Sequence, residues 1–254
     1  MVIRLDTGPR DAKATVFVHG AGMAGWMWKK QIDHWPAARK IIVDLPDHGL
    51  DRGRPFGSIE AAAAELAAII ASECSGGKAS LVGHSLGARI VLETLARYPD
   101  CAAGAVVSSA LVRPSLLVSM LNSHTLNVFS LWLLRNERLA RLQARQFGFA
   151  DSDMEASYLE DIRVMKAENL ERPVAAFSSA LFLPAGLEAV HCPVLVTAGS
   201  KETRGMLASA GEIAAAIPGA EIATLQGADH TYPWSHFDAY NNLLASHPAL
   251  GLVG

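Results

Sequence analysis

A serine flanked by glycines, placed between a strand and a helix, is the feature that most restricts how this chain can fold. The segment Gly83–Gly87 (GHSLG) follows a short apolar run, Ala79–Gly83, that is typical of a buried strand. A helical pattern, Leu86–Tyr98, comes next and stops before Pro99. Side chains at positions 83 and 87 would collide with neighbouring backbone in so sharp a turn. The sequence therefore predicts a strained Ser85 with its hydroxyl exposed at a helix N-terminus.

Short apolar runs alternate with helical patterns along most of the chain. Six of the runs are dense in Val, Ile or Leu and lack clean polar alternation, which is typical of parallel strands buried on both faces. A further run near the start is expected at the edge of the sheet. The pattern predicts an α/β protein with a mostly parallel, seven-stranded sheet and helices on both faces. The expected strands are Val2–Asp6, Ala14–His19, Lys40–Asp44, Ala79–Gly83, Gly104–Ser109, Val194–Gly199 and Glu221–Leu225.

Residues 112–186 interrupt this alternation and contain no convincing strand. Their helical patterns carry too many aromatic residues and leucines for a disordered loop. We expect a helical cap over the carboxyl edge of the sheet, inserted into a core formed by residues 1–111 and 187–254. The expected cap helices are Leu116–Leu121, Phe129–Phe147, Asp153–Asn169 and Val174–Leu183, and the expected core helices are Ile59–Glu73, Leu86–Tyr98, Thr203–Ile217 and Ser235–Ser246.

The bulk composition argues against several classes of partner. The chain has 254 residues, 50% of them apolar, and a net charge of −3, which is too mild to favour nucleic acid or an acidic membrane surface. No apolar run is long enough to span a membrane, and the start lacks the features of a signal peptide. The cysteines, Cys74, Cys101 and Cys192, lack metal-type spacing and fit a reducing cytoplasm. We expect a monomer or homodimer that acts on a small molecule and needs no metal or other cofactor.

Further segments match a known family in order along the chain. His19–Gly22 (HGAG), after a strand, is similar to the HG-x-G loop of α/β-hydrolases, and Trp28 lies where these proteins often have a tryptophan. Asp44–Gly49 (DLPDHG) is similar to their D-x-P-G-H-G turn, with Asp47 in place of the usual glycine. The chain thus resembles the α/β-hydrolase fold superfamily over nearly its whole length apart from the cap, and most closely small, cap-bearing serine esterases and related bacterial hydrolases.

The resemblance implies a catalytic triad with Ser85 as the nucleophile. His230 follows the last expected strand, where the family places its general base, and the order Ser, acid, His is that of α/β-hydrolases. Glu202 follows the strand Val194–Gly199, where the family usually carries an aspartate, and would orient the imidazole. Asp229 adjoins His230 in sequence and would struggle to reach the ring Nδ1.

The same chemistry needs donors for the negative oxygen that develops on the substrate. Removing one such donor raises a reaction barrier by about 3–4 kcal/mol. One donor should be the backbone N–H of Leu86, and the resemblance implies that of Ala21 as the other. Five further residues are candidates to bind substrate, with ordinary packing as the alternative for each: Met23, Trp26, His84, Trp132 and Trp234.

A serine nucleophile disfavours haloalkane dehalogenases and typical epoxide hydrolases, which need a carboxylate. We expect a carboxylesterase-type enzyme that cleaves a small to medium, largely apolar ester, thioester or lactone through an acyl-enzyme. Two alternatives use the same fold: a C–C bond hydrolase on the same triad, and a small-molecule receptor with little turnover.

A dinucleotide-binding fold is a more distant alternative. Gly20–Gly25 (GAGMAG) follows a strand, and Asp44 comes about 20 residues later, which is the spacing of such folds. The stretch before Pro36 is, however, poor as the long helix these folds need. This alternative also leaves the GHSLG turn and His230 unexplained.

Overall fold

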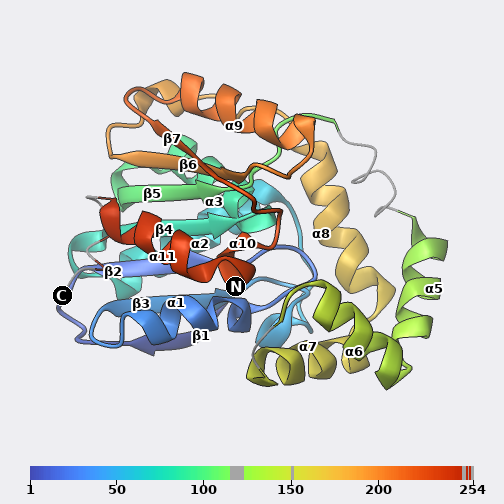
Figure 1. Ribbon diagram of the computed structural model, residues 1–254. Helices are drawn as coiled ribbons and strands as arrows, with labels where there is room; N and C mark the ends of the chain where they lie inside the picture. The colour runs from blue at the N-terminus through green and yellow to red at the C-terminus, as the bar shows by residue number, and fades with distance from the viewer. Residues whose placement is uncertain (115–122, 150–151, 248–249, 251, 253–254) are drawn as a thin grey trace.

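The computed structural model describes residues 1–114, 123–149, 152–247, 250 and 252. In these ranges seven strands form one sheet in the order β1-β3-β2-β4-β5-β6-β7, and only the edge strand β1 runs antiparallel to its neighbour (Figure 1). The predicted mostly parallel, seven-stranded sheet is therefore confirmed. The strands are β1 (Val2–Thr7), β2 (Ala14–Val18), β3 (Arg39–Asp44), β4 (Ala79–His84), β5 (Ala102–Ser108), β6 (Val194–Gly199) and β7 (Glu221–Leu225).

The sheet separates two apolar cores, because successive side chains of a strand point to opposite faces. In β2, Val16 and Val18 pack into one core and Phe17 into the other. The paired strand β3 repeats the pattern, since Val16 lies opposite Ile41 and Phe17 opposite Ile42. Burial on both faces explains why these strands appear in the sequence as unbroken apolar runs.

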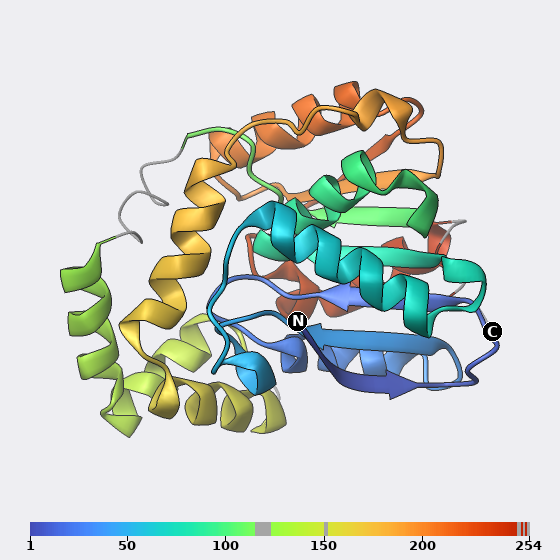
Figure 2. The same cartoon turned by 180° about the vertical axis from the view of Figure 1, so that it is seen from behind.

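Helices cover both faces of the sheet (Figures 1 and 2). Residues of α2 (Ile59–Glu73), α3 (Leu86–Arg97) and α9 (Arg204–Ala216) pack into one core, and residues of α11 (Phe237–Ser246) pack into the other. None of the helices in the described ranges is both long and apolar enough to cross a membrane. The shorter helices of the core are η1 (Gly25–Trp28), α1 (Lys29–His34), η2 (Gly49–Asp51), η3 (Ser75–Gly77), η4 (Pro99–Cys101), η5 (Leu187–Ala189) and α10 (Tyr232–Ser235).

Helices α5 to α8 lie between β5 and β6 in the chain and beyond the carboxyl ends of the parallel strands (Figures 1 and 2). We call this region the α5–α8 segment. The helices of the segment are α5 (His124–Leu134), α6 (Glu137–Gln146), α7 (Ser152–Val164) and α8 (Ala167–Ser179), and the predicted helix Leu116–Leu121 lies outside the described residues.

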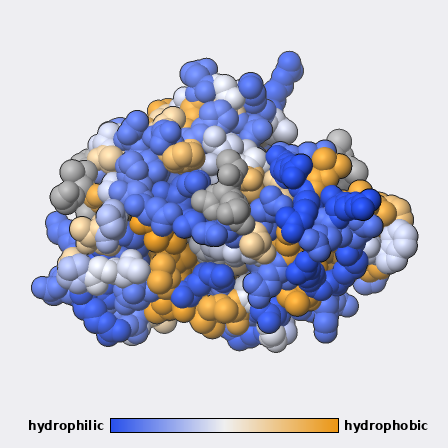
Figure 3. Space-filling view, turned by 60° about the horizontal axis from the view of Figure 1, so that its bottom comes forward, coloured by the Kyte–Doolittle hydropathy of each residue, from blue (hydrophilic) through white to orange (hydrophobic). Residues whose placement is uncertain are grey.

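The surface seen from the β1 edge is mainly hydrophilic, with apolar groups in small patches (Figure 3).

Two predicted helices of this segment are each split in the structure. Instead of one helix over Phe129–Phe147, α5 ends at Leu134, and the Asn136 side chain accepts from the first N–H groups of α6. An asparagine at this position satisfies donors that a helix start leaves unpaired. The prediction missed this N-cap.

The predicted helix Asp153–Asn169 is also divided, and the predicted helix Val174–Leu183 is displaced. The Arg135 guanidinium donates to carbonyl oxygens at the end of α7, at distances of 2.8 and 3.0 Å. The Asn169 side chain then accepts from the N–H of Lys166 at the start of α8. The break therefore depends on side chains that cap one helix and begin the next.

The turn after β4 requires glycine because α3 packs directly on neighbouring strands. A Cβ on Gly83 would lie 2.6 Å from the Gly87 carbonyl oxygen. A Cβ on Gly87 would lie 2.7 Å from the His19 carbonyl oxygen. Real Cβ atoms do not approach backbone so closely, so the elements would have to separate.

We expect Gly87→Ala to lower the free energy of unfolding by about 1–3 kcal/mol, the usual cost of overpacking a rigid site. Gly211→Ala is the matched control, because Gly211 lies within α9 and a Cβ there would meet nothing within 4 Å. The control should raise the free energy of unfolding by about 0.5–1 kcal/mol, since alanine is more favourable than glycine in a helix interior. Urea unfolding measures both, and equal small effects would contradict the close packing of α3.

Candidate active site

The backbone at Ser85 adopts a conformation that side-chain-bearing residues rarely take, with φ 54° and ψ −114°. Hydrogen bonds hold it on both sides. The Ser85 N–H donates to the Ser108 carbonyl oxygen at 2.9 Å, and the Ser85 carbonyl accepts from the Arg89 N–H at 3.0 Å. The surroundings thus fix a strained turn and place this serine at the N-terminus of α3.

His230 and Glu202 meet from the loops that follow β7 and β6. The imidazole Nδ1 and the carboxylate Oε1 are 2.5 Å apart. The Glu202 side chain is 2% exposed and that of His230 is 45% exposed. Because a carboxylate only accepts, Nδ1 carries a proton, and the neutral form of the ring has its lone pair on Nε2. Asp229 accepts instead from the N–H and hydroxyl of Thr231, at 2.9 and 2.5 Å.

The second oxygen of Glu202 is bound as well. It accepts from the Ser109 hydroxyl at 3.1 Å and from the Gly199 N–H at 3.2 Å. Ser109 itself has a positive φ of 54°, in the loop just after β5. Both carboxylate oxygens are therefore paired, which a buried carboxylate needs.

A chain of buried hydroxyl groups continues from Ser109 into the sheet. Ser109 contacts the Tyr232 hydroxyl at 3.1 Å, and Tyr232 contacts Thr197 at 2.8 Å. Ser108 then links Thr197, at 2.9 Å, to the hydroxyl of Tyr240, at 2.8 Å. Burial raises the pKa of Tyr232 and of Tyr240 above the usual value, so both phenols stay protonated.

A cavity of about 520 Å³, which we call the Ser85 cavity, opens where Ser85, Glu202 and His230 come together. This volume lies in the usual range for a small-molecule site. Ala21 and Leu86, the expected oxyanion donors, and Met23 and Trp234, two of the expected contact residues, are part of its wall. The rest of the wall is mostly apolar and consists of Leu111, Phe147, Val174, Phe177, Lys201, Thr203, Met206, Asp229 and Thr231.

Two buried histidines hold the loop that carries Ala21. His48 Nε2 accepts from the Gly22 N–H at 3.0 Å, and His19 Nε2 accepts from the Leu45 N–H at 2.9 Å. Nδ1 of each ring donates to a backbone carbonyl at 2.8 Å. Burial, with the neighbouring His48 ring, lowers the pKa of His19 to about 3, and burial also lowers the pKa of His48. Both rings are therefore neutral, as their acceptor role requires.

Three expected contact residues do not line the Ser85 cavity. His84 is 2% exposed, and its ring lies 4.6 Å from that of His230, centroid to centroid. Burial lowers the pKa of His84 well below the usual value, so the ring that packs against His230 is neutral. Trp132 is 67% exposed and stacks on Phe129 with 5.9 Å between ring centroids.

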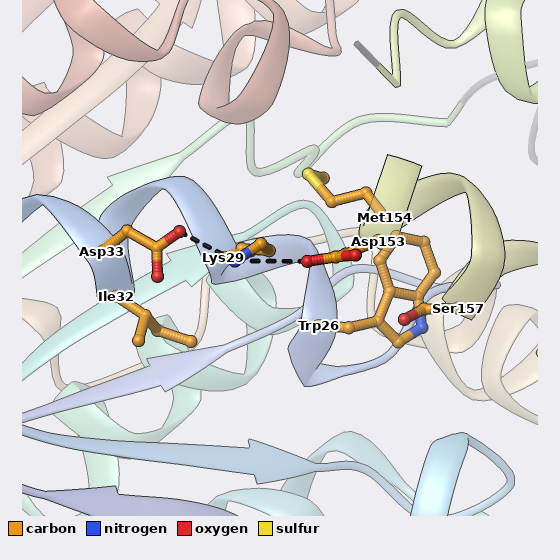
Figure 4. Close-up of a pocket in the computed structure, with 7 residues that line it drawn as sticks. All are labelled: Trp26, Lys29, Ile32, Asp33, Asp153, Met154 and Ser157. Carbon is orange, nitrogen blue, oxygen red and sulfur yellow. Dashed lines mark hydrogen bonds and ion pairs between the residues drawn. The ribbon is translucent and has the colours of Figure 1, made fainter. Parts of the chain in front are cut away.

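Trp26 is the third, and it lines a separate cavity of about 220 Å³ between η1, α1 and α7 (Figure 4). Its Nε1 donates to Asp161 of α7 at 2.6 Å. At the same cavity, Lys29 lies between Asp33 at 2.9 Å and Asp153 at 3.7 Å (Figure 4). Trp26 thus joins the core to α7, and its apolar character in the sequence could not distinguish one cavity from another.

The roles of His48, Ser109 and the hydroxyl chain were not predicted. Ser109 follows β5 and Glu202 follows β6, and neighbouring parallel strands bring these loops together. The strand order was the missing information, because the two residues are 93 positions apart. In the described ranges, no three His, Cys, Asp or Glu side chains are grouped so that they could hold a metal ion.

The chain is similar to known proteins over most of its length. The model of the alpha/beta hydrolase family matches residues 15–243. The chain belongs to the alpha/beta hydrolase family. Over 102 residues it is 34% identical to "Probable esterase PIR7A" of Oryza sativa subsp. indica, and this match covers 39% of each chain. The matched part is thus well under two thirds of that relative's length.

Two solved structures share the fold of this alpha/beta hydrolase. A thermophilic esterase from Thermogutta terrifontis superposes with a TM-score of 0.71 at 20% identity, over 95% of this chain and 90% of that one. The enol-lactonase from Burkholderia xenovorans LB400 gives a TM-score of 0.72 at 20% identity, over 95% and 94%. At this identity the likeness concerns the fold.

We expect this alpha/beta hydrolase to lose stability as the pH falls below about 6.5, the usual pKa of histidine in an unfolded chain. His19 and His48 stay neutral in the folded state while the unfolded chain takes up protons. Each such histidine lowers the free energy of unfolding by up to about 1.4 kcal/mol per pH unit below that value. In His48→Gln, where an acceptor for the Gly22 N–H can remain, the loss between pH 7.5 and 5 should be smaller.

Urea unfolding of both proteins at the two pH values gives this difference. Burial raises the pKa of Asp51 to about 6, which acts in the opposite direction, but this term is common to both proteins. The exposed His34 provides a control variant, His34→Gln, that should leave the loss unchanged. An equal loss in wild type and His48→Gln would contradict the neutral state of His48.

Proposed function

We propose that this chain is a serine hydrolase that cleaves a small to medium, largely apolar carboxylic ester through an acyl-enzyme on Ser85. One observation carries the proposal. A single cavity has in its wall a strained serine, a histidine hydrogen-bonded to a buried glutamate, and the residues Ala21 and Leu86. Nucleophile, base, orienting acid and oxyanion donors are the parts that acyl transfer needs.

In the first half of the reaction, the Ser85 Oγ attacks the ester carbonyl carbon while His230 Nε2 takes up the hydroxyl proton. Glu202 holds the Nδ1 proton and stabilises the imidazolium that forms. The backbone N–H groups of Ala21 and Leu86 donate to the negative oxygen. His230 then returns its proton to the leaving alcohol as the C–O bond breaks.

In the second half, water replaces the alcohol. His230 takes a proton from the water as it attacks the acyl carbon, and Ser85 regains a proton when the acid leaves. The hydrogen bonds of His48 with Gly22 and of Glu202 with Ser109 involve none of the reacting atoms, so the site should need little rearrangement between steps.

The apolar wall of the cavity supports an apolar acyl or alcohol group. Phe147, Val174 and Phe177 come from residues 112–186, which we propose act as a cap over the core of residues 1–111 and 187–254. The similarity to the rice protein named as a probable esterase supports the ester class. Thioesters and lactones present the same carbonyl to Ser85 and belong to the same proposal.

We expect steady hydrolysis of a simple aryl ester over many turnovers, because the proposed nucleophile, base, acid and oxyanion donors all line one cavity. The rate of hydrolysis by Ser85→Ala should fall close to the background rate, with only the acceleration that binding and the oxyanion donors supply. Release of the aryl alcohol, followed by absorbance, measures both. A single burst equal to the protein concentration, followed by no further release, would instead favour a receptor.

We expect Glu202→Gln to lower kcat by up to about 10⁴-fold, the effect of the matching amide substitution in a serine protease. Asp229→Asn is the matched control, because Asp229 is a carboxylate next to His230 that binds Thr231 instead of the imidazole. Its kcat should change far less. Small and equal losses in the two variants would reject Glu202 as the residue that orients His230.

A further inference from the structure

Asp47 is a buried carboxylate in the turn after β3 that binds the α5–α8 segment. Its side chain is 0% exposed, and its φ of 68° is unfavourable for a residue with a side chain. One oxygen accepts from the Phe56 N–H at 2.8 Å and from Arg172 Nε at 2.9 Å. The other accepts from Asn169 at 2.9 Å and from Arg172 Nη2.

Arg172 therefore makes a bidentate contact with Asp47, which joins the core to α8 across 125 positions of sequence. Two parallel hydrogen bonds from a planar guanidinium fix direction as well as distance. The Arg172 side chain is 39% exposed, but withdrawing it would leave the buried charge of Asp47 without this cation, which is unfavourable. The pair consequently resists any shift of α8 away from the core.

The end of α8 is also tied to the core. Arg89 of α3 donates from Nε to the Ala180 carbonyl oxygen at 2.9 Å, and it pairs with Glu93 at 3.0 Å. The side chains of Arg89 and Glu93 are 4% and 5% exposed. Buried polar contacts thus hold α8 at both ends. Between these contacts, Val174 and Phe177 line the Ser85 cavity.

The turn that carries Asp47 also contacts the loop that carries Ala21, since the next residue, His48, accepts from the Gly22 N–H. On the other side of that loop, Leu170 of α8 is close enough that a Cβ on Gly22 would meet its Cδ2 at 3.4 Å. The turn after β3 and helix α8 therefore both contact the loop that carries Ala21, and α8 also forms an apolar wall of the same cavity.

We propose that the Asp47–Arg172 pair is a specificity-determining anchor, which holds Val174 and Phe177 at a fixed depth in the Ser85 cavity and so sets the length of the acyl or alcohol chain that fits. This proposal rests on the proposed ester hydrolysis. Asp47 and Arg172 act through α8 and are positioning residues. A longer chain fits only where the wall formed by α8 leaves room.

The test compares wild type with Arg172→Gln, Asp47→Asn and the double variant. Asparagine tolerates a positive φ, so Asp47→Asn removes the charge and keeps the turn. Arg163→Gln is the matched control, because Arg163 is an exposed arginine that pairs with Glu137 inside the α5–α8 segment. The first measurement is kcat/KM for aryl esters from acetate to octanoate, expressed as the ratio of octanoate to acetate.

We expect the ratio of octanoate to acetate to rise about tenfold or more in each single variant, because a loosened α8 lets the wall move back from a longer chain and one methylene in an apolar pocket is worth at least about tenfold. The change should appear mainly in KM for the longer ester. The effect in the double variant should be smaller than the two single effects combined, because both residues act through the same contact. The control should keep the wild-type ratio. If Asp47→Asn fails to fold, Arg172→Lys provides a second test, because lysine keeps the charge without the bidentate contact. It should shift the ratio in the same direction as Arg172→Gln, but by a smaller factor.

Hydrogen exchange of the α8 amides, without substrate, is the second measurement. Exchange should be faster in Arg172→Gln and Asp47→Asn than in wild type or Arg163→Gln. A wild type that hydrolyses none of the esters would refute the proposed function, while exchange in α8 would still decide whether the pair anchors the helix. Normal ester turnover with an unchanged chain-length ratio and unchanged exchange would overturn the anchor alone.

Discussion

The site depends on the close packing of α3 against the carboxyl ends of β2 and β4. Only glycine at positions 83 and 87 permits that approach, and it forces Ser85 into a strained turn at the start of the helix. One backbone hydrogen bond to the neighbouring strand β5 holds this strained residue, since the Ser85 N–H donates to the Ser108 carbonyl oxygen. The next residue, Ser109, donates to Glu202. Ser85 and Glu202 are thus positioned through adjacent residues at the end of one strand, so that the sheet itself sets their separation.

Buried polar groups then fix what apolar packing leaves adjustable. Hydrophobic contacts are non-directional, whereas each of these hydrogen bonds specifies a direction. The hydroxyl chain from Ser109 to Tyr240 joins Glu202 to α11, and the neutral rings of His19 and His48 join the loop that carries Ala21 to the turn after β3. Desolvation keeps these histidines uncharged, and an uncharged ring can accept from backbone N–H groups. Burial is therefore a cause of the geometry as well as its consequence.

The sequence predicts the strands well, because burial on both faces leaves an unbroken apolar run that needs no knowledge of the partner strand. The GHSLG turn is predictable for a related reason, since its steric demand is local. Contacts between distant segments are not predictable in this way. The pairing of Asp47 with Arg172 and of His48 with Gly22 depends on how loops meet at the sheet edge. The tryptophans show the same limit, since Trp234 lines the Ser85 cavity, Trp26 another, and Trp132 lies on the surface.

The central claim is that Ser85 is the activated nucleophile of this cavity, and covalent labelling tests it most directly. A serine-directed phosphonate forms a stable bond to a hydroxyl that an adjacent base activates, with or without turnover of any substrate. Peptide mass spectrometry of the labelled protein should place one adduct on Ser85, and Ser85→Ala should remain unlabelled over the same time. An adduct that forms on another residue at comparable speed, or the absence of any adduct on the folded wild-type protein, would contradict the account.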